Sequence, residues 1–212
     1  MIKFEDITLS YNGQPVFKDF SMEINKGEKA VILGRSGLGK SSLFSLILGF
    51  VRPREGRVLF DGTCVDEKTV WDVRRRTAFV DQDVSLGRGK VFEWFSLISK
   101  FRANAALDFS RDRIIGTMRL FDLEQDLLNK DISELSGGER QRFAIVAAVL
   151  TNRKVFLLDE ATSALDKDLK AKVSDFFLLR KDWTVVAISH DPVWTGRPFV
   201  KIFDLEEGKW KR

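Results

Sequence analysis

The run GRSGLGKS at residues 34–41 constrains this chain more than any other feature of its sequence. It fits the pattern Gly-x-x-x-x-Gly-Lys-[Ser/Thr], follows the apolar run AVIL at 30–33 and precedes the segment KSSLFSLILGF at 40–50, which is typical of a helix. Glycines let backbone N–H groups curl around phosphate oxygens, and the N-terminus of a helix adds partial positive charge. The sequence therefore predicts a strand, a phosphate-binding loop and a helix, in that order.

This loop offers candidate ligands for a nucleoside triphosphate and its magnesium ion. The Lys40 ammonium can reach the β- and γ-phosphates, and the Ser41 hydroxyl suits Mg²⁺. The alternative is an incidental lysine in a glycine-rich turn, which the flanking strand and helix disfavour. We expect the following residues to bind the nucleotide: Gly34, Arg35, Ser36, Gly37, Leu38, Gly39, Lys40, Ser41 and Ser42.

A second segment, LLDEATSALD at 157–166, places two adjacent carboxylates directly after buried aliphatic residues. Ligands of open α/β sheets bind at the carboxyl ends of the strands, so we expect the strand VFLL at 155–158 to lie beside the phosphate loop. Asp159 is then a Mg²⁺ partner, and Glu160 is the general base that orients a water onto the γ-phosphate. The alternative is that both acids begin a helix, where negative charge is favourable.

The order of apolar patterns along the chain predicts the domain organisation. Strand-like runs fill 2–33, a hairpin pattern with an Asp-Gly turn follows at 58–65, and helical spacing dominates 90–150. We expect an α/β fold: a P-loop NTPase core with a mixed, largely parallel sheet, an N-terminal antiparallel β subdomain and an inserted α-helical subdomain. The predicted single domain, 1–212, divides into a core of 1–87 and 151–212 and a helical part of 88–150.

Composition limits the classes of function. A net charge of +4 suits an anionic ligand but does not predict a nucleic-acid partner, because the longest basic block is Arg74-Arg75-Arg76. No stretch approaches about 20 uncharged apolar residues, so we expect no membrane span and no signal peptide. A single cysteine, Cys64, rules out an internal disulfide and favours a reducing compartment.

From LSGGERQR at 135–142 the sequence resembles a known family, the ATP-binding cassette (ABC) ATPases. Motifs typical of that family occur in its order over nearly the whole chain. They are Tyr11 for the adenine-stacking aromatic, 34–41 for Walker A, Gln82 for the Q-loop, 135–139 for the signature, 155–160 for Walker B, 163–166 for the D-loop and His190 for the switch histidine.

The resemblance implies a role for each matching residue. Glu160, His190 and Gln82 would act in ATP hydrolysis, and Ser41, Gln82 and Asp159 would hold Mg²⁺. Ser136, Gly137 and Gly138 would reach the ATP of a second subunit in a head-to-tail dimer, with Asp166 at the same interface. Simpler readings exist for each: a capping box of Ser136 with Glu139, a structural His190, a surface amide at Gln82 and an ordinary strand residue at Tyr11.

The resemblance also implies an ATP-hydrolysing subunit of a transporter, peripheral on the cytoplasmic face of the cell membrane. Separate permease subunits would dock near the Q-loop and residues 90–101, where KVFEWFSLISKF carries an apolar stripe wider than one core face needs. The partner cassette would be a second copy, bound when ATP binds. By eye the chain is nearest to small stand-alone cassettes of metal-export systems. The alternative is a cassette ATPase with soluble partners, as in iron–sulfur cluster assembly.

Overall fold

The computed structural model describes residues 1–211 and has a six-stranded sheet at its centre. The strand order is β10 (Lys209–Trp210), β9 (Lys201–Asp204), β3 (Lys29–Leu33), β8 (Thr184–Ile188), β7 (Val155–Asp159) and β6 (Thr77–Val80). All neighbouring strands are parallel except β9 and β10, which form an antiparallel pair. The sheet is therefore mixed and largely parallel, as predicted.

A second, antiparallel sheet is built mainly from the N-terminal segment. Its strand order is β2 (Gln14–Ile24), β1 (Ile2–Tyr11), β4 (Glu55–Phe60) and β5 (Thr63–Cys64). The predicted hairpin joins β4 to β5 through Asp61 and Gly62, which both have left-handed backbone φ angles of 48° and 79°. This is the conformation that an Asp-Gly pair tolerates in a tight turn. The second sheet confirms the antiparallel part of the predicted fold class.

Seven α-helices and three short 3₁₀ helices complete residues 1–211. The α-helices are α1 (Lys40–Ile47), α2 (Val70–Arg76), α3 (Val91–Ser99), α4 (Arg111–Arg119), α5 (Gly137–Leu150), α6 (Lys167–Leu178) and α7 (Pro192–Thr195). The 3₁₀ helices are η1 (Arg102–Asn104), η2 (Gln125–Asn129) and η3 (Ile132–Glu134). None of these helices is long and apolar enough to cross a bilayer.

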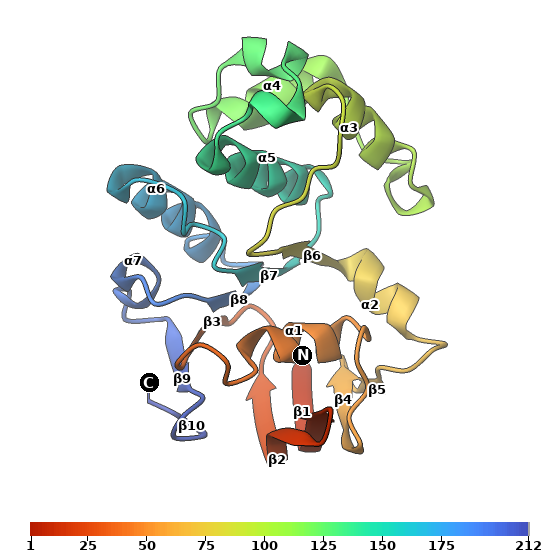
Figure 1. Cartoon of the computed structure of the whole chain (residues 1–212), viewed down its shortest axis with the longest axis vertical. Coiled ribbons are helices and arrows are strands. Elements are labelled where there is room, and N and C mark those ends of the chain that lie inside the picture. The colour runs from red at the N-terminus through yellow and green to blue at the C-terminus, as the bar shows by residue number, and fades with distance from the viewer. Residues whose placement is uncertain (212) are drawn as a thin grey trace.

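Both faces of the six-stranded sheet are covered, which explains why its inner strands are almost wholly apolar. Along β7, Val155 and Leu157 pack into a core with α1 and the antiparallel sheet, whereas Phe156 and Leu158 pack into a core with α5 and α6. In Figure 1 the helices α3, α4 and α5 stand on one side of the sheet and the antiparallel sheet on the other. The predicted boundaries of the helical part, 88 and 150, stay a prediction.

Candidate functional site

The carboxyl ends of four parallel strands bring the predicted site residues to one edge of the sheet. Leu158 of β7 pairs with Val80 of β6, and Asp159 pairs with Ile188 of β8, which in turn pairs with Ile32 of β3. The phosphate loop, His190, Glu160 and Gln82 each follow one of these strand ends. The end of β7 lies beside the phosphate loop, as expected, since Ser41 donates a hydrogen bond to Asp159, although β8 is hydrogen-bonded between β3 and β7.

The phosphate loop needs its glycines for two different reasons. Gly37 and Gly39 have φ angles of 85° and 89°, a region that side-chain-bearing residues rarely adopt. A Cβ on Gly39 would also lie 2.3 Å from Cγ1 of Val16 in β2, whereas a Cβ on Gly37 would meet nothing within 4 Å. The loop is thus curled by its backbone and pressed against the antiparallel sheet at Gly39.

The charged residues of the loop are held in place by the loop and by a neighbouring turn. The Lys40 ammonium donates hydrogen bonds to the carbonyl oxygens of Gly34, at 2.5 Å, and Arg35, at 3.0 Å. Both the backbone N–H and the guanidinium of Arg35 are paired with the Glu206 carboxylate, at 2.9 and 3.1 Å. Lys40 therefore lies across the mouth of the loop, while Arg35 has a protein partner in the turn after β9.

Asp159 and Ser41 make a pair of oxygen donors suited to magnesium. Burial raises the pKa of Asp159 above its ordinary value, a hydrogen bond from Ser41 opposes that rise, and the charge of Asp81 adds to it. No cluster of three or more His, Cys, Asp or Glu side chains within residues 1–211 forms a closed metal cage. One carboxylate and one hydroxyl fit Mg²⁺, which keeps several waters and takes further oxygens from a substrate phosphate.

Glu160 follows Asp159 in an unusual backbone conformation. Its φ of 43° is left-handed, and its N–H donates to the Ile188 carbonyl at 3.0 Å, so the chain turns sharply at the end of β7. Burial raises the pKa of the Glu160 carboxyl, while the neighbouring His190 imidazole acts in the opposite direction and Asp159 raises it further. A buried carboxylate with a raised pKa is a candidate general base.

Two further residues predicted for the site, Gln82 and Tyr11, are exposed and lie near the same edge of the sheet. Gln82 is exposed and lies between Asp81 and Asp83, whose charges both act on Asp159, so this segment borders the site. Tyr11, at the end of β1, donates a hydrogen bond to the Ser42 hydroxyl at 3.4 Å, which sets its ring beside the start of α1. Their roles as magnesium contact and adenine platform stay predictions.

The signature residues lie apart from the phosphate loop of their own chain. Ser136 caps α5: its hydroxyl accepts from the N–H of Glu139 at 3.2 Å, and the Glu139 carboxylate accepts from the N–H of Ser136 at 2.7 Å. Asp166 caps α6 in the same way through the N–H of Leu169. Within residues 1–211 no hydrogen bond joins Ser136, Gly137 or Gly138 to the loop. The capping box is thus present, and the phosphate contact of these residues stays a prediction.

Sequence reasoning missed one polar residue of this region, Gln141. It is buried inside α5 and hydrogen-bonded to the backbone of Glu160. No local signal marks this position, because its sequence neighbours Arg140 and Arg142 are charged; a buried amide needs partners for its polar atoms, and only the structure shows them. The resemblance drew attention to the start of the helix and away from this position.

Comparison with known proteins identifies the family. The family described as "ABC transporter" matches residues 17–163. An ATP-dependent lipid A-core flippase of Haemophilus ducreyi is 34% identical over 196 residues, which are 89% of this chain and 34% of the flippase. A spermidine/putrescine import ATP-binding protein of Legionella pneumophila is 34% identical over 197 residues, 90% of this chain and 52% of that protein. The chain spans about a third of the flippases that it matches.

Solved structures agree with this assignment. The dimeric structure of MJ0796, a bacterial ABC transporter cassette, has a TM-score of 0.84 and is 28% identical to this chain. The match covers 100% of this chain and 97% of that one. The same cassette in a post-hydrolysis state bound to ADP and phosphate has a TM-score of 0.82. With the phosphate loop, Asp159 and Glu160 at one sheet edge, this chain belongs to the ABC transporter family as an ATP-binding ATPase domain.

Proposed function

We propose that this chain hydrolyses ATP with Mg²⁺ and drives transport through separate membrane subunits, as one half of a head-to-tail dimer that encloses two ATP molecules. The observation that carries the proposal is the position of Glu160, which is half-buried, has a raised pKa and is near enough to Asp159 and the loop lysine Lys40 for both charges to act on it. This arrangement places a proton acceptor beside the phosphate-binding groups, as phosphoryl transfer to water requires.

Each group on the sheet edge has a distinct part in this reaction. The loop N–H groups and Lys40 bind the β- and γ-phosphates, and Tyr11 stacks on the base. Ser41 and Asp159 would hold Mg²⁺, with Gln82 beside them, and the metal would neutralise the charge that develops on the phosphate oxygens. Glu160 accepts a proton from the attacking water, and His190, which follows the next strand, contacts the γ-phosphate.

The dimer follows from the separation of the two anion-binding helix ends. The start of α5 carries Ser136, Gly137 and Gly138 but has no hydrogen bond to the loop of the same chain. A second copy placed head to tail sets this helix end against the γ-phosphate of its partner, and Asp166 then lies at the interface. A solved structure supports this arrangement, because the bacterial ABC transporter cassette that matches the whole of this chain is a dimer.

A groove beside the site supports docking of the membrane subunits. A cavity of about 1160 Å³ is lined by β6, the segment after it, α3 and α5, and three residues of the predicted apolar stripe line it: the partly buried Trp94 and Ile98 and the exposed Phe101. Phe95 and Val91 of the same stripe are fully buried and belong to the core. Only part of the stripe is therefore free for a partner, because its residues lie on different faces of α3 and only one face packs on the core.

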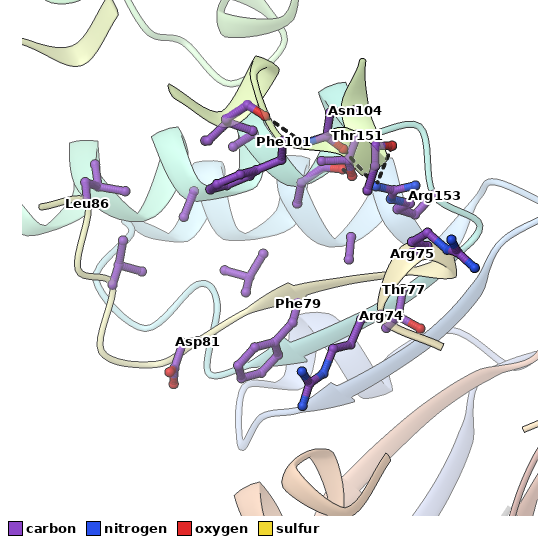
Figure 2. A pocket seen from close by; sticks show the side chains of 18 of the residues that line it. Arg74, Arg75, Thr77, Phe79, Asp81, Leu86, Phe101, Asn104, Thr151 and Arg153 are labelled. Carbon is purple, nitrogen blue, oxygen red and sulfur yellow. Dashed lines mark hydrogen bonds between the residues drawn. The ribbon is translucent and has the colours of Figure 1, made fainter. Parts of the chain in front are cut away.

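The charges of this groove are divided between its two ends. Figure 2 shows Arg75 and Arg153 at one end and Asp81 toward the other. The hydroxyl of Thr77, the buried first residue of β6, has no hydrogen-bond partner within residues 1–211. We propose that the permease inserts an amphipathic segment that places a carboxylate at the arginine end, on the cytoplasmic face of the membrane.

The proposed function is tested by Glu160→Gln. This substitution keeps the shape of the side chain but removes the proton acceptor, so we expect turnover of Mg-ATP to fall by roughly 10²-fold or more. ATP then persists at the site, and size-exclusion chromatography with Mg-ATP should show a dimer that is absent without nucleotide. Asp159→Asn is the matched comparison, because it should weaken Mg-ATP binding as well as catalysis.

Two results would contradict the proposal. Parent-rate turnover by the Glu160→Gln chain would remove Glu160 from its role as the base. An inactive Glu160→Gln chain that stays monomeric at saturating Mg-ATP would reject the ATP-bound dimer of this chain.

A further inference from the structure

A single buried amide joins the signature helix to the turn that carries Glu160. Gln141, in the second turn of α5, is 3% exposed. Its Nε2 donates to the Glu160 carbonyl at 3.0 Å and to the Ser163 hydroxyl at 3.2 Å, and its Oε1 accepts from the Ala164 N–H at 3.0 Å. These bonds engage both N–H groups and the carbonyl of the amide. Gln141 therefore ties together three points of the turn at 160–164.

The turn that Gln141 holds is strained at its first residue. Seven non-glycine residues within 1–211 have a positive φ, and all of them except Glu160 are Asn or Asp, which adopt this region most readily. The Glu160 N–H donates to the Ile188 carbonyl of β8, and the Glu160 carbonyl accepts from the Ser163 N–H, but neither bond connects the turn to α5. Strained backbone persists only where its surroundings fix it. The Gln141 amide is part of that fixing environment.

Two further contacts confine the same turn. The backbone of Ala164 lies so close to α5 that a Cβ on Gly138 would be 3.0 Å from the Ala164 carbonyl oxygen. From the opposite side, the indole N–H of the buried Trp194 in α7 donates to the Thr162 hydroxyl at 3.0 Å. The turn is thus packed between the signature helix and the segment that follows His190.

We propose that Gln141 is a positioning residue for ATP hydrolysis. It fixes the backbone at Glu160, and so the carboxylate, against the phosphate loop, and it makes α5 and Glu160 move as one unit. A shift of the signature helix on contact with a second subunit is then carried to the general base. Gln141 does not touch the reactants. This inference rests on the proposed function, because it requires Glu160 to be the base.

Gln141→Met tests the inference, since methionine has a similar length and makes none of the three hydrogen bonds. We expect kcat for ATP to fall at least tenfold, because a small misplacement of a catalytic group is costly, while KM changes less than about twofold. Thr117→Val is the control: it removes a buried hydroxyl bonded within α4 and should change neither kcat nor KM.

Amide hydrogen exchange at Ala164 provides a readout that does not depend on catalysis. Exchange should be at least tenfold faster in Gln141→Met, whereas Gln141→Glu keeps the acceptor for the Ala164 N–H and should remain protected there. Because Gln141→Glu has no donor for the Glu160 carbonyl at neutral pH, its kcat should still be low. This second variant also keeps the test decisive where Gln141→Met fails to fold.

The results that would overturn the inference differ from those that would overturn the proposed function. Parent kcat in both Gln141 variants, a rise in KM at constant kcat, or an equal loss of kcat in Thr117→Val would each reject the positioning role. Unchanged Ala164 exchange in Gln141→Met would reject the contact itself. Absence of ATP hydrolysis by the parent chain would instead reject the proposed function.

Discussion

Burial sets Asp159 and Glu160 apart from the other acidic residues of the chain. Among the acids of residues 1–211 whose pKa departs from the ordinary value, these two alone have it raised. The others have it lowered by hydrogen bonds at turns and helix starts, as in Asp66 and Asp131, or by hydrogen bonds from lysine and arginine side chains, as in Glu5 and Asp182. Raised carboxyl pKa values beside a lysine and a histidine mark a site of proton transfer rather than of structural pairing.

The raised pKa of Glu160 predicts how hydrolysis depends on pH. A base with a folded-state pKa above 4.5 is protonated at a higher pH than an ordinary glutamate, so kcat/KM should begin to fall before the pH reaches 4.5. An ATPase assay across pH 4.5 to 8 measures this limb. The residual activity of Glu160→Gln should not show this fall of kcat/KM at acidic pH. The same fall in that variant would mean that another group titrates.

The same group should affect stability in the opposite sense. Because the folded chain binds this proton more readily than the unfolded chain, the Glu160 contribution to the unfolding free energy rises as the pH falls from the folded pKa to 4.5. The difference in unfolding free energy between the parent and Glu160→Gln chains, measured by urea denaturation at several pH values, gives the contribution of Glu160. A difference that does not change with pH would contradict the raised pKa.

Residue types and their place after strands were enough to predict Lys40, Asp159 and Glu160 as one cluster. Gln141 could not be found in the same way, because its partners, two backbone atoms and the Ser163 hydroxyl, lie 19 to 23 positions away. Arg35 shows the converse. Its place in the loop made it a candidate ligand, and only the structure shows its pairing with Glu206. Long-range partners of this kind have no local sequence signal.

At the scale of elements, the phosphate loop depends on β2 as well as on its own strand and helix. Val16 and Phe17 of β2 occupy the space where a side chain on Gly39 would lie, with Cβ distances of 2.3 and 3.0 Å. The antiparallel sheet therefore supports the loop directly. It also explains how Tyr11, at the far end of β1, comes beside Ser42.

Gly39→Ala tests this support, with Gly37→Ala as the matched control. Both residues have a left-handed φ, so each substitution should cost roughly 1–2 kcal/mol of stability from backbone strain. Gly39→Ala alone also overpacks β2, which adds roughly 1–3 kcal/mol. Chemical denaturation should rank Gly39→Ala below Gly37→Ala. Equal stability of the two variants would show that β2 yields at no cost and does not hold the loop.

Most elements were predictable from local pattern, because strand runs, the Asp-Gly hairpin and the capping box each have a local physical cause. The helices α2 and α7 were not predicted. Each is shorter than eight residues, so neither completes the repeat that reveals an amphipathic helix. In α2, Arg74 donates to the Leu48 carbonyl and packs on Phe50 and Trp71.

At the scale of the whole molecule, the order of strands decides which side chains meet. The sequence indicated parallel strands with crossover helices, but the insertion of β8 between β3 and β7 depends on pairing between distant segments. That order places His190 between the phosphate loop and Glu160. It also leaves β6 at the edge of the sheet, where the segment after it, together with α3 and α5, forms the groove.

The groove therefore connects the proposed docking surface to the nucleotide site through one segment. Asp81 and Asp83, directly after β6, act on Asp159 and also line the groove. At its other end, Arg153 donates to the Asn104 side chain at 2.8 Å and holds η1 over the opening. A partner seated in the groove would thus contact the residues on either side of Gln82, which gives membrane subunits a route to the site.

The charge division of the groove predicts that Arg75→Glu weakens attachment to the membrane. Arg75 is exposed at the arginine end of the groove. Reversing its charge should repel the carboxylate of the docked segment. We expect the binding free energy to weaken by about 1.4 kcal/mol or more, which corresponds to a tenfold loss of affinity. The fraction of tagged cassette recovered with membrane vesicles measures this, beside ATP hydrolysis by the isolated chain, which should stay within about twofold of the parent. Arg119→Glu is the control, because Arg119 is equally exposed but lines a shallow surface between α4 and α6. If both variants lose membrane attachment equally, the loss is explained by net charge and not by the groove. If the parent chain is found only in the soluble fraction, the result favours a soluble partner.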